Sequence, residues 1–263
     1  MCLIALALDA HPRYSLVLAA NRDEFHGRPT APASWWDDAP QIFGGRDLQQ
    51  HGSWLATARD GRWAAVTNVR RMELPDPTAP SRGALIANYL RGEAGAQAYG
   101  ESLAGSAARY AGFNLLLGDH RGVWYLSNHG GNHGDGPSGF VMQALTPGVH
   151  AVSNASLDTP WPKLVTLKSR LTPWCADGET DTGTLFAALA DQGLAADGEL
   201  PDTGVGLERE RFLSAAFVRS TIYGTRCSTV LTVDGGGHAG FHEKRYGPDA
   251  VFAGETLEYL QLG

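Results

Sequence analysis

Short apolar runs bounded by turn residues constrain the fold of this chain more than any other feature of its sequence. The runs are joined by polar segments such as RDGR (59–62), DHRG (119–122) and DGGG (234–237). Two apolar runs joined by so short a segment are typical of a β-hairpin. We therefore expect antiparallel strands over residues 2–8, 14–20, 53–58, 63–69, 113–118, 123–127, 148–153, 228–233 and 238–244.

Helical patterns are confined to the middle of the chain, whereas strand pairs stand near both ends. The helical patterns cover residues 81–92, 95–110, 160–171 and 181–193. This order lacks the regular alternation of strand and helix that predicts a parallel sheet. It predicts the α+β class, with two antiparallel sheets covered by helices. We find no internal repeat or linker, so we expect residues 1–263 to form one domain.

Composition argues against several classes of protein. The chain has 21 Lys and Arg against 28 Asp and Glu, so its net charge of −7 gives no basic footprint for nucleic acid. No apolar stretch approaches the ~20 residues of a membrane span. Three widely spaced cysteines argue against a disulfide framework or a zinc site, and for a reducing compartment. The apolar run 2–8 is too short for a signal peptide, and we expect a cytoplasmic protein.

A cysteine directly follows the initiator methionine. On one interpretation, Cys2 is a small apolar residue that begins a buried strand. On the other, Met1 is removed and Cys2 becomes a nucleophile that carries its own α-amino group. That amine has a reference pKa near ~8 and can act as a base at neutral pH.

The polar sequence NRDE (21–24) ends the second apolar run. If the first two runs form a hairpin, Cys2 faces Ala20, give or take two residues. The polar segment then lies beside the thiol and the amine. Arg22 would lower the pKa of the thiol, and Asp23 would orient the amine. The alternative is that this segment is a solvated strand end.

Acyl transfer also needs donors for an oxyanion, each worth roughly 3 kcal/mol. Asn68 and Asn154 follow predicted strands, whereas Asn114 begins one and Asn128 precedes a glycine-rich loop. Asparagine is also common in turns after strands, so any of these side chains can have a purely structural role.

Several other residues have two interpretations. Trp35, Trp36 and Trp54 either line a pocket or belong to the core. The segment ERER (208–211) is expected to form a solvated helix face. His129 and His133 are four residues apart in a glycine-rich loop, which makes a poor metal site, so we expect no bound metal.

Several blocks of this sequence resemble the NRDE family, also called the transport and Golgi organisation protein 2 family. The blocks span nearly the whole chain and come in the expected order: MC, LAANRDEFHGRPT, GGRD, GSWLA, AVTNVR, SRGALIANYL, GFNLLLGD, SNASLDTPWPK and YGTRCSTVL. The resemblance implies the N-terminal nucleophile hydrolase fold, a four-layer αββα sandwich of two antiparallel sheets between helices.

A weaker resemblance extends to choloylglycine hydrolases and penicillin V acylases. It implies a cysteine nucleophile, an Arg and an Asp beside it, two asparagines and a late arginine. The late arginine is one of Arg211, Arg219 and Arg226, and the block YGTRCST favours the last. The implied site residues are Cys2, Arg22, Asp23, Asn68, Asn154 and Arg226. The implied activity is hydrolysis of a non-peptide C–N amide bond of a small molecule through a thioester, without a cofactor.

The NRDE resemblance also implies an alternative of another class. Some members of the family are linked to haem handling and to lipid metabolism. On that interpretation the chain is a non-catalytic haem or lipid binding and trafficking protein, with haem as its ligand. The sequence contains no CxxCH motif for covalent haem attachment.

Overall fold

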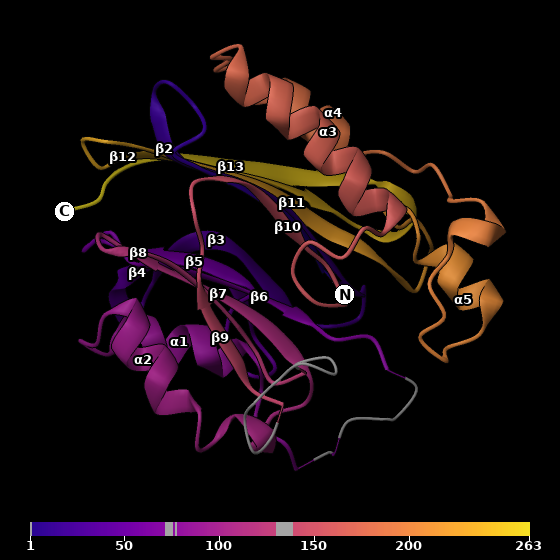
Figure 1. The fold of residues 1–263 in the computed structure, drawn as a ribbon, viewed down its shortest axis with the longest axis horizontal. Coiled ribbons are helices and arrows are strands. Elements are labelled where there is room, and N and C mark those ends of the chain that lie inside the picture. Colours follow the sequence, from indigo (N-terminus) through magenta and orange to yellow (C-terminus); the bar gives the residue numbers. More distant parts are fainter. Residues whose placement is uncertain (1, 72–75, 77, 130–138) are drawn as a thin grey trace.

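Two antiparallel sheets pack face to face, and helices cover the outer face of each (Figure 1). The computed structural model describes residues 2–71, 76, 78–129 and 139–263. The first sheet has six strands, in the order β10 (Gly148–Val152), β1 (Cys2–Leu8), β2 (Tyr14–Phe25), β11 (Tyr223–Asp234), β12 (His238–Tyr246) and β13 (Phe252–Gln261).

The second sheet has seven strands, all taken from residues 30–144. Their order is β3 (Thr30–Trp36), β4 (Ala39–Asp47), β5 (Leu55–Ala58), β6 (Trp63–Asn68), β7 (Phe113–Asp119), β8 (Gly122–Ser127) and β9 (Val141–Ala144). Helices α1 (Gly83–Arg91) and α2 (Ala96–Leu103) pack on this sheet. Helices α3 (Pro162–Ala176) and α4 (Gly183–Leu189) pack on the first sheet, and α5 (Leu207–Phe212) follows them in the chain. The predicted αββα sandwich is confirmed.

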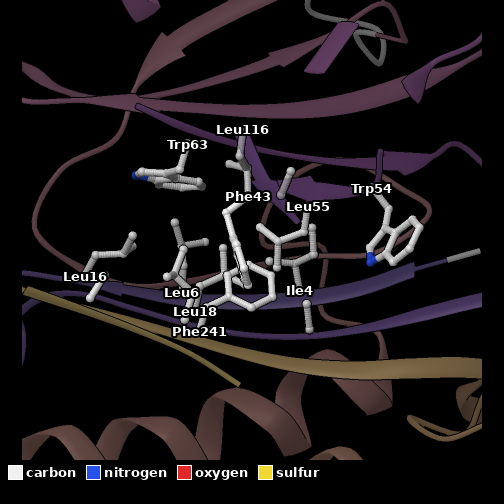
Figure 2. Close-up of a cluster of buried hydrophobic side chains, with 14 of the residues drawn as sticks. Ile4, Leu6, Leu16, Leu18, Phe43, Trp54, Leu55, Trp63, Leu116 and Phe241 are labelled. Atoms are coloured by element: carbon white, nitrogen blue, oxygen red, sulfur yellow. The ribbon is translucent and has the colours of Figure 1, made fainter. Parts of the chain in front are cut away.

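Side-chain alternation divides the apolar residues of β1 between two cores. Ile4, Leu6 and Leu8 point into the space between the sheets, whereas Leu3 and Ala5 point toward the helices. A strand that is buried on both faces needs an unbroken apolar sequence, and β1 has one. Figure 2 shows the layer between the sheets, where Leu6 and Leu18 lie close to Phe43 and Phe241.

The outer helices are amphipathic. Helix α3 buries Leu164, Leu167 and Leu171, which recur at intervals of three and four residues and pack against the first sheet. Pro162 occupies its first turn, where the missing N–H costs no hydrogen bond. Among the described residues, no helix combines the length and the apolar character that a membrane crossing requires.

The hairpin predictions are confirmed for the pairs β1–β2, β5–β6, β7–β8 and β11–β12. Strand β2 does not end at residue 20 as expected, because it continues through residues 21–24 to Phe25 and pairs with β11 there. Residues 21–23 are buried, which excludes the alternative of a solvated strand end for them. Strands β3, β4, β9 and β13 were not expected. Their sequences are interrupted by proline, glycine or polar residues, which conceals the apolar pattern.

Two helix predictions also need correction. The segment 95–110 is not one helix but α2, followed by a 3₁₀ turn at Ala107–Arg109. The segment 208–211 lies in α5 and is not wholly solvated, because Glu210 is only 2 % exposed. Glu210 forms a buried ion pair with Arg70, a residue distant in sequence.

Candidate active site

The register of β1 and β2 fixes the position of Cys2. Cys2 is the Cα partner of Arg22, two residues beyond Ala20 and within the expected range. Paired residues on neighbouring strands point to the same face of a sheet. Because Ile4 and Ala20 point between the sheets, Cys2 and Arg22 must point there as well. The sequence therefore places a thiol opposite a guanidinium at one end of the inter-sheet layer.

Arg22 is a buried cation with few partners. It is 6 % exposed, and its guanidinium carbon lies 4.3 Å from the ring centroid of Trp54. Its Nη1 donates to Thr30 Oγ1 at 3.2 Å. It forms no ion pair with a carboxylate among the residues the structure describes. The guanidinium therefore adds positive potential beside Cys2, which the negative charges of Asp23 and Glu24 oppose.

Asp23 is 2 % exposed and accepts a hydrogen bond from Thr225 Oγ1 at 2.7 Å. A β-bulge makes this contact possible. Asp23 pairs with Thr225 and Arg22 pairs with Cys227, so Arg226 is an extra residue without a partner on β2. Bulges often redirect side chains beside functional sites. Here the bulge turns Arg226 toward the backbone carbonyls of Phe25 and Arg28, at 2.8 and 3.1 Å.

Asn68 and Asn154 form a hydrogen-bonded pair at the ends of two strands in different sheets. Asn154 is fully buried, and its Nδ2 donates to Asn68 Oδ1 at 3.0 Å and to the Asn68 carbonyl at 2.9 Å. Both N–H groups of Asn154 are thus used. Because Asn154 holds the Oδ1 of Asn68, it fixes the direction of the Asn68 Nδ2 group.

A polar network beneath this pair joins the two sheets. Ser153 Oγ donates to the carbonyl of Cys2 at 2.8 Å, and the Thr67 hydroxyl donates to the carbonyl of Ser153. Asn114 Nδ2 donates to Thr67 Oγ1 at 3.0 Å, and Tyr125 donates to Asn114 Oδ1 at 2.7 Å. The network sets the distance between the Cys2 strand and the Asn68 strand.

Cys2 lines a cavity of about 240 Å³. Asn68 and Trp54 line it as well. Of the three candidate tryptophans, Trp54 is the one found among the described lining residues. Its charged lining residues are Arg22, Asp23, Glu24, Arg28, Asp47, Asp76 and Arg82. Cys2, Arg22, Asp23 and Asn68 therefore share one cavity, and Asn154 adjoins it through Asn68.

Burial raises the pKa of the Cys2 thiol, and the negative charges of Asp23 and Glu24 raise it further. Arg22 acts in the opposite direction, but burial has the larger effect. Cys2 is thus mainly a thiol at neutral pH and needs a base to become a nucleophile. Burial also raises the pKa of Cys175, to about 11, and that of Cys227.

Further buried charges adjoin Asp23. Lys163 is 5 % exposed, and its Nζ donates to the carbonyl of Leu213 at 3.0 Å. Burial lowers the pKa of Lys163 to about 8, and the charge of Asp23 opposes this shift. Arg70, the partner of Glu210, donates its backbone N–H to the carbonyl of Asn154 at 2.8 Å. Helix α5 is thereby connected to the asparagine pair.

The late arginines lie elsewhere. Arg226 lines a different cavity of about 240 Å³, which shares only Arg22 and Trp54 with the described lining of the Cys2 cavity. Arg211 pairs with Asp197 at 2.7 Å on the surface. Arg219 is not among the described residues that line the Cys2 cavity either.

The other residues singled out from the sequence have roles in the fold rather than in the cavity. Asn128 Nδ2 donates to the carbonyls of Ala107 and Tyr110, and its Oδ1 accepts from the backbone of Phe113. Trp35 and Trp36 pack in the core, beneath Arg59 and Arg46. His133 lies outside the described residues, as does Met1. Within the described part of the chain, no cluster of three or more His, Cys, Asp or Glu could hold a metal ion.

Sequence reasoning missed Arg82 and Arg28 as cavity residues. Arg82 immediately precedes α1, and it looked like an ordinary residue at the start of a helix. Arg82 occupies the cap position of α1, and no side chain caps this helix. The available signals were the family blocks SRGALIANYL, which contains Arg82, and LAANRDEFHGRPT, which contains Arg28.

Comparisons with known proteins agree with this architecture. The sequence profile of the family described as Transport and Golgi organisation 2 matches residues 1–248. The chain belongs to this family. It is 32 % identical over 275 residues to the human Transport and Golgi organization protein 2 homolog, covering 98 % of each chain. It is 31 % identical over 264 residues to the mouse Transport and Golgi organization 2 homolog, covering 93 % of this chain and 92 % of the relative.

Two solved structures show which fold this Transport and Golgi organisation 2 family member has. One is the Caenorhabditis elegans N-acylethanolamine-hydrolyzing acid amidase ortholog, with TM-score 0.51, 11 % identity and coverage of 88 % of this chain and 92 % of that chain. The other is the C2A mutant of a conjugated bile acid hydrolase from Clostridium perfringens, with TM-score 0.52, 8 % identity and coverage of 99 % and 92 %. The chain thus has the N-terminal nucleophile hydrolase fold.

Proposed function

We propose that this chain is a cysteine hydrolase that cleaves a non-peptide C–N amide bond, with Cys2 as its amino-terminal nucleophile. One observation carries the proposal. Cys2 is paired with Arg22 in the sheet and opens into a cavity that it shares with Asn68. A nucleophile, a cation and an amide donor thus meet in one partly enclosed cavity, the combination that acyl transfer requires.

The acylation step uses the α-amine of Cys2 after Met1 has been removed. The amine takes the proton of the thiol while the sulfur forms a bond to the amide carbon. The carbonyl oxygen becomes an oxyanion and accepts a hydrogen bond from Asn68 Nδ2, which Asn154 orients. When the intermediate collapses, the C–N bond breaks and the α-ammonium returns the proton to the leaving amine. A thioester on Cys2 remains.

Deacylation reverses these roles. The α-amine takes a proton from water, and the hydroxide adds to the thioester carbon. The C–S bond then breaks, the acid product leaves and the sulfur recovers its proton. In both steps Arg22 stabilises negative charge on the sulfur, and Asp23 orients the amine and stabilises the ammonium that forms when the amine takes a proton.

The proposal is tested by intact mass and by turnover of an amide panel. We expect the purified protein to lack Met1, and an amide substrate to add an acyl mass to Cys2 that hydroxylamine removes. The variant Cys2→Ser should lose turnover, whereas the control Cys175→Ser should keep it. Retention of Met1 in the purified protein would overturn the proposal, since an acylated nitrogen is not a base.

Haem or lipid binding without turnover is the second candidate, and the name of the family, which refers to transport, favours it. Titration with haem distinguishes the two functions. A stoichiometric Soret shift with no consumption of any amide supports a carrier. Amide turnover that depends on Cys2 supports the hydrolase.

A further inference from the structure

Three arginines line the Cys2 cavity, and they differ in their partners. Arg28 is paired twice, with Asp47 at 2.6 Å and with Glu24 at 3.9 Å. Arg22 and Arg82 form no ion pair with any carboxylate that the structure describes. A guanidinium has five N–H donors, and an unpaired one in a partly enclosed site attracts an anion.

Arg82 is the more available of the two unpaired arginines. Its Nη1 donates to the carbonyl of Gly112 at 3.2 Å, and we find no other hydrogen bond from its side chain within the described residues. Burial lowers the pKa of Arg82, and the charge of Cys2 opposes that shift, so the two groups lie within electrostatic reach. Arg82 therefore presents most of its donors to the cavity in which the reaction would take place.

The carboxylates of the cavity are already engaged. Glu24 and Asp47 pair with Arg28, and Asp23 accepts a hydrogen bond from Thr225. Asp76 accepts hydrogen bonds from the backbone and hydroxyl groups of Thr78, both at 2.7 Å. Glu24 and Asp47 share the charge of Arg28, whereas the neutral donors to Asp23 and Asp76 satisfy carboxylate oxygens without cancelling their charge. The excess of positive charge that could attract an anion therefore lies in the larger cavity that adjoins Arg82.

A second, larger cavity continues from the first. It measures about 550 Å³ and shares Asn68, Asp76, Ala79, Arg82 and Ala111 with the Cys2 cavity. Its described lining contains five arginines and one carboxylate, which are Arg70, Arg71, Arg82, Arg109, Arg209 and Asp76. Among these lining residues, Arg82 is the arginine common to both cavities and therefore stands at their junction.

We propose that the substrate carries an oxyanion, in the simplest case a carboxylate, which binds Arg82 at the junction of the two cavities while the scissile amide lies against Cys2. This inference rests on the proposed function and names its substrate class. The Cys2 cavity has room for roughly eight water-sized groups, so it holds only the reacting end of a substrate. The anion extends from that end toward the larger cavity, and Arg22 adds positive potential to the same path.

The first experiment compares two thiol reagents of similar size, iodoacetate and iodoacetamide, which differ in charge. In both cases the Cys2 thiolate displaces iodide, so the ratio of their rates does not depend on the pKa of the thiol. The ratio is measured by peptide mass at Cys2 and divided by the ratio for the same peptide in urea. We expect iodoacetate to be favoured in the folded protein, and Arg82→Gln to reduce that preference by about tenfold, the worth of one charge-assisted hydrogen bond.

Two further variants serve as controls. Arg82→Lys keeps the positive charge and should restore much of the preference. Arg121→Gln removes an exposed arginine outside both cavities and should leave the preference unchanged. An equal ratio in wild type and Arg82→Gln, with Cys2 labelled by both reagents, would overturn the oxyanion site and leave the hydrolase proposal intact. If neither reagent labels Cys2 in the folded protein, both proposals fail together.

The second experiment uses a matched pair of amides, an N-acylglycine and its uncharged N-acylglycinamide. We expect the acid to have the lower KM, and Arg82→Gln to raise KM for the acid about tenfold with little change in kcat. The KM of the uncharged amide should not change. Equal KM values for the two amides in the wild type would contradict the oxyanion site, while their turnover would still support the hydrolase.

Discussion

The space between the two sheets is apolar over most of its length and polar at the end that contains Cys2. On β1, Ile4 and Leu6 belong to the apolar part, and Cys2 stands only two residues before Ile4. On β2, Leu18 belongs to the apolar part, and Arg22 stands two residues beyond Ala20. The same face of the same strand pair thus serves packing in one region and chemistry in the next.

This contrast shows what the apolar region contributes to the site. A buried guanidinium without a carboxylate is costly, because burial removes its hydration. The well-packed layer around Leu6, Leu18 and Phe43 supplies the stability that offsets this cost. Mutations in the apolar region should therefore act on folding, and mutations at the polar end should act on reaction.

The largest effect is expected at the nucleophile. Cys2→Ala should reduce amide turnover at least about a thousandfold, because no other group can form the thioester. Its free energy of unfolding should change by less than about 1 kcal/mol, since Cys2 lies at the edge of the packed layer. Steady-state kinetics and urea unfolding measure the two quantities. A variant that unfolds easily but still turns over would reverse the assignment of this region.

The converse change is Leu18→Ala in the apolar region. It should destabilise the fold by about 3 kcal/mol, since it leaves a cavity among fully buried side chains. Thiol labelling of Cys2 in the fraction that stays folded should keep its wild-type rate. A large fall in that rate would show that the two regions are not separable.

The asparagine pair gives a prediction about which side chain contacts the oxyanion and which one only orients its neighbour. Asn68→Ala should reduce kcat about a hundredfold, because it removes the donor to the oxyanion. Asn154→Ala should reduce kcat about tenfold, since it only loosens the orientation of Asn68. The double variant should be no slower than Asn68→Ala alone. Additive losses would instead indicate that both side chains contact the oxyanion.

The smallest effect is expected at Asp23, and there labelling and turnover should change in opposite directions. Burial raises the pKa of Cys2, so labelling of the folded protein should reach its midpoint at a higher pH than labelling of the unfolded chain. Asp23→Asn removes a negative charge that adds to this rise, so the labelling rate at pH 7 should increase about threefold. Turnover should fall, because the amine loses its carboxylate. A fall in labelling would contradict the electrostatic role of Asp23.

Much of this fold could be predicted from the sequence because hairpins leave local signals. The β1–β2 register followed from strand lengths and one turn, and it placed Cys2 within two residues of its partner Arg22. The extent of β2 could not be predicted in this way. Residues 21–23 are polar and look solvated, and only the pairing with β11, some 200 residues later, buries them.

The prediction of the site was limited in the same way, because local patterns do not reveal long-range contacts. Cys2, Arg22, Asp23 and Asn68 share a cavity, and each was identified from a local pattern or from the family resemblance. Arg82 and Arg28 escaped notice because the family blocks that contain them, SRGALIANYL and LAANRDEFHGRPT, do not show which of their residues reach the cavity. Arg82 lies between β6, a strand of the second sheet, and α1, which packs on that sheet, whereas Cys2 lies in the first sheet. Arg82 reaches the cavity only because the two sheets pack together. Such long-range placement has no counterpart in a single sequence.

The bulge in β11 determines which single-residue deletions this strand can accept. Arg226 has no partner on β2, while Thr225 and Cys227 pair with consecutive residues of that strand. Loss of Arg226 would close the ladder and keep Thr225 beside Asp23. Loss of one residue from the paired stretch after Cys227 would shift the register, so the following side chains would point to the opposite face of the sheet. Leu231 would then leave the layer between the sheets. Deletion of Arg226 would therefore keep the register of this strand at the loss of its hydrogen bonds to Phe25 and Arg28, whereas deletion of a paired residue would shift the register.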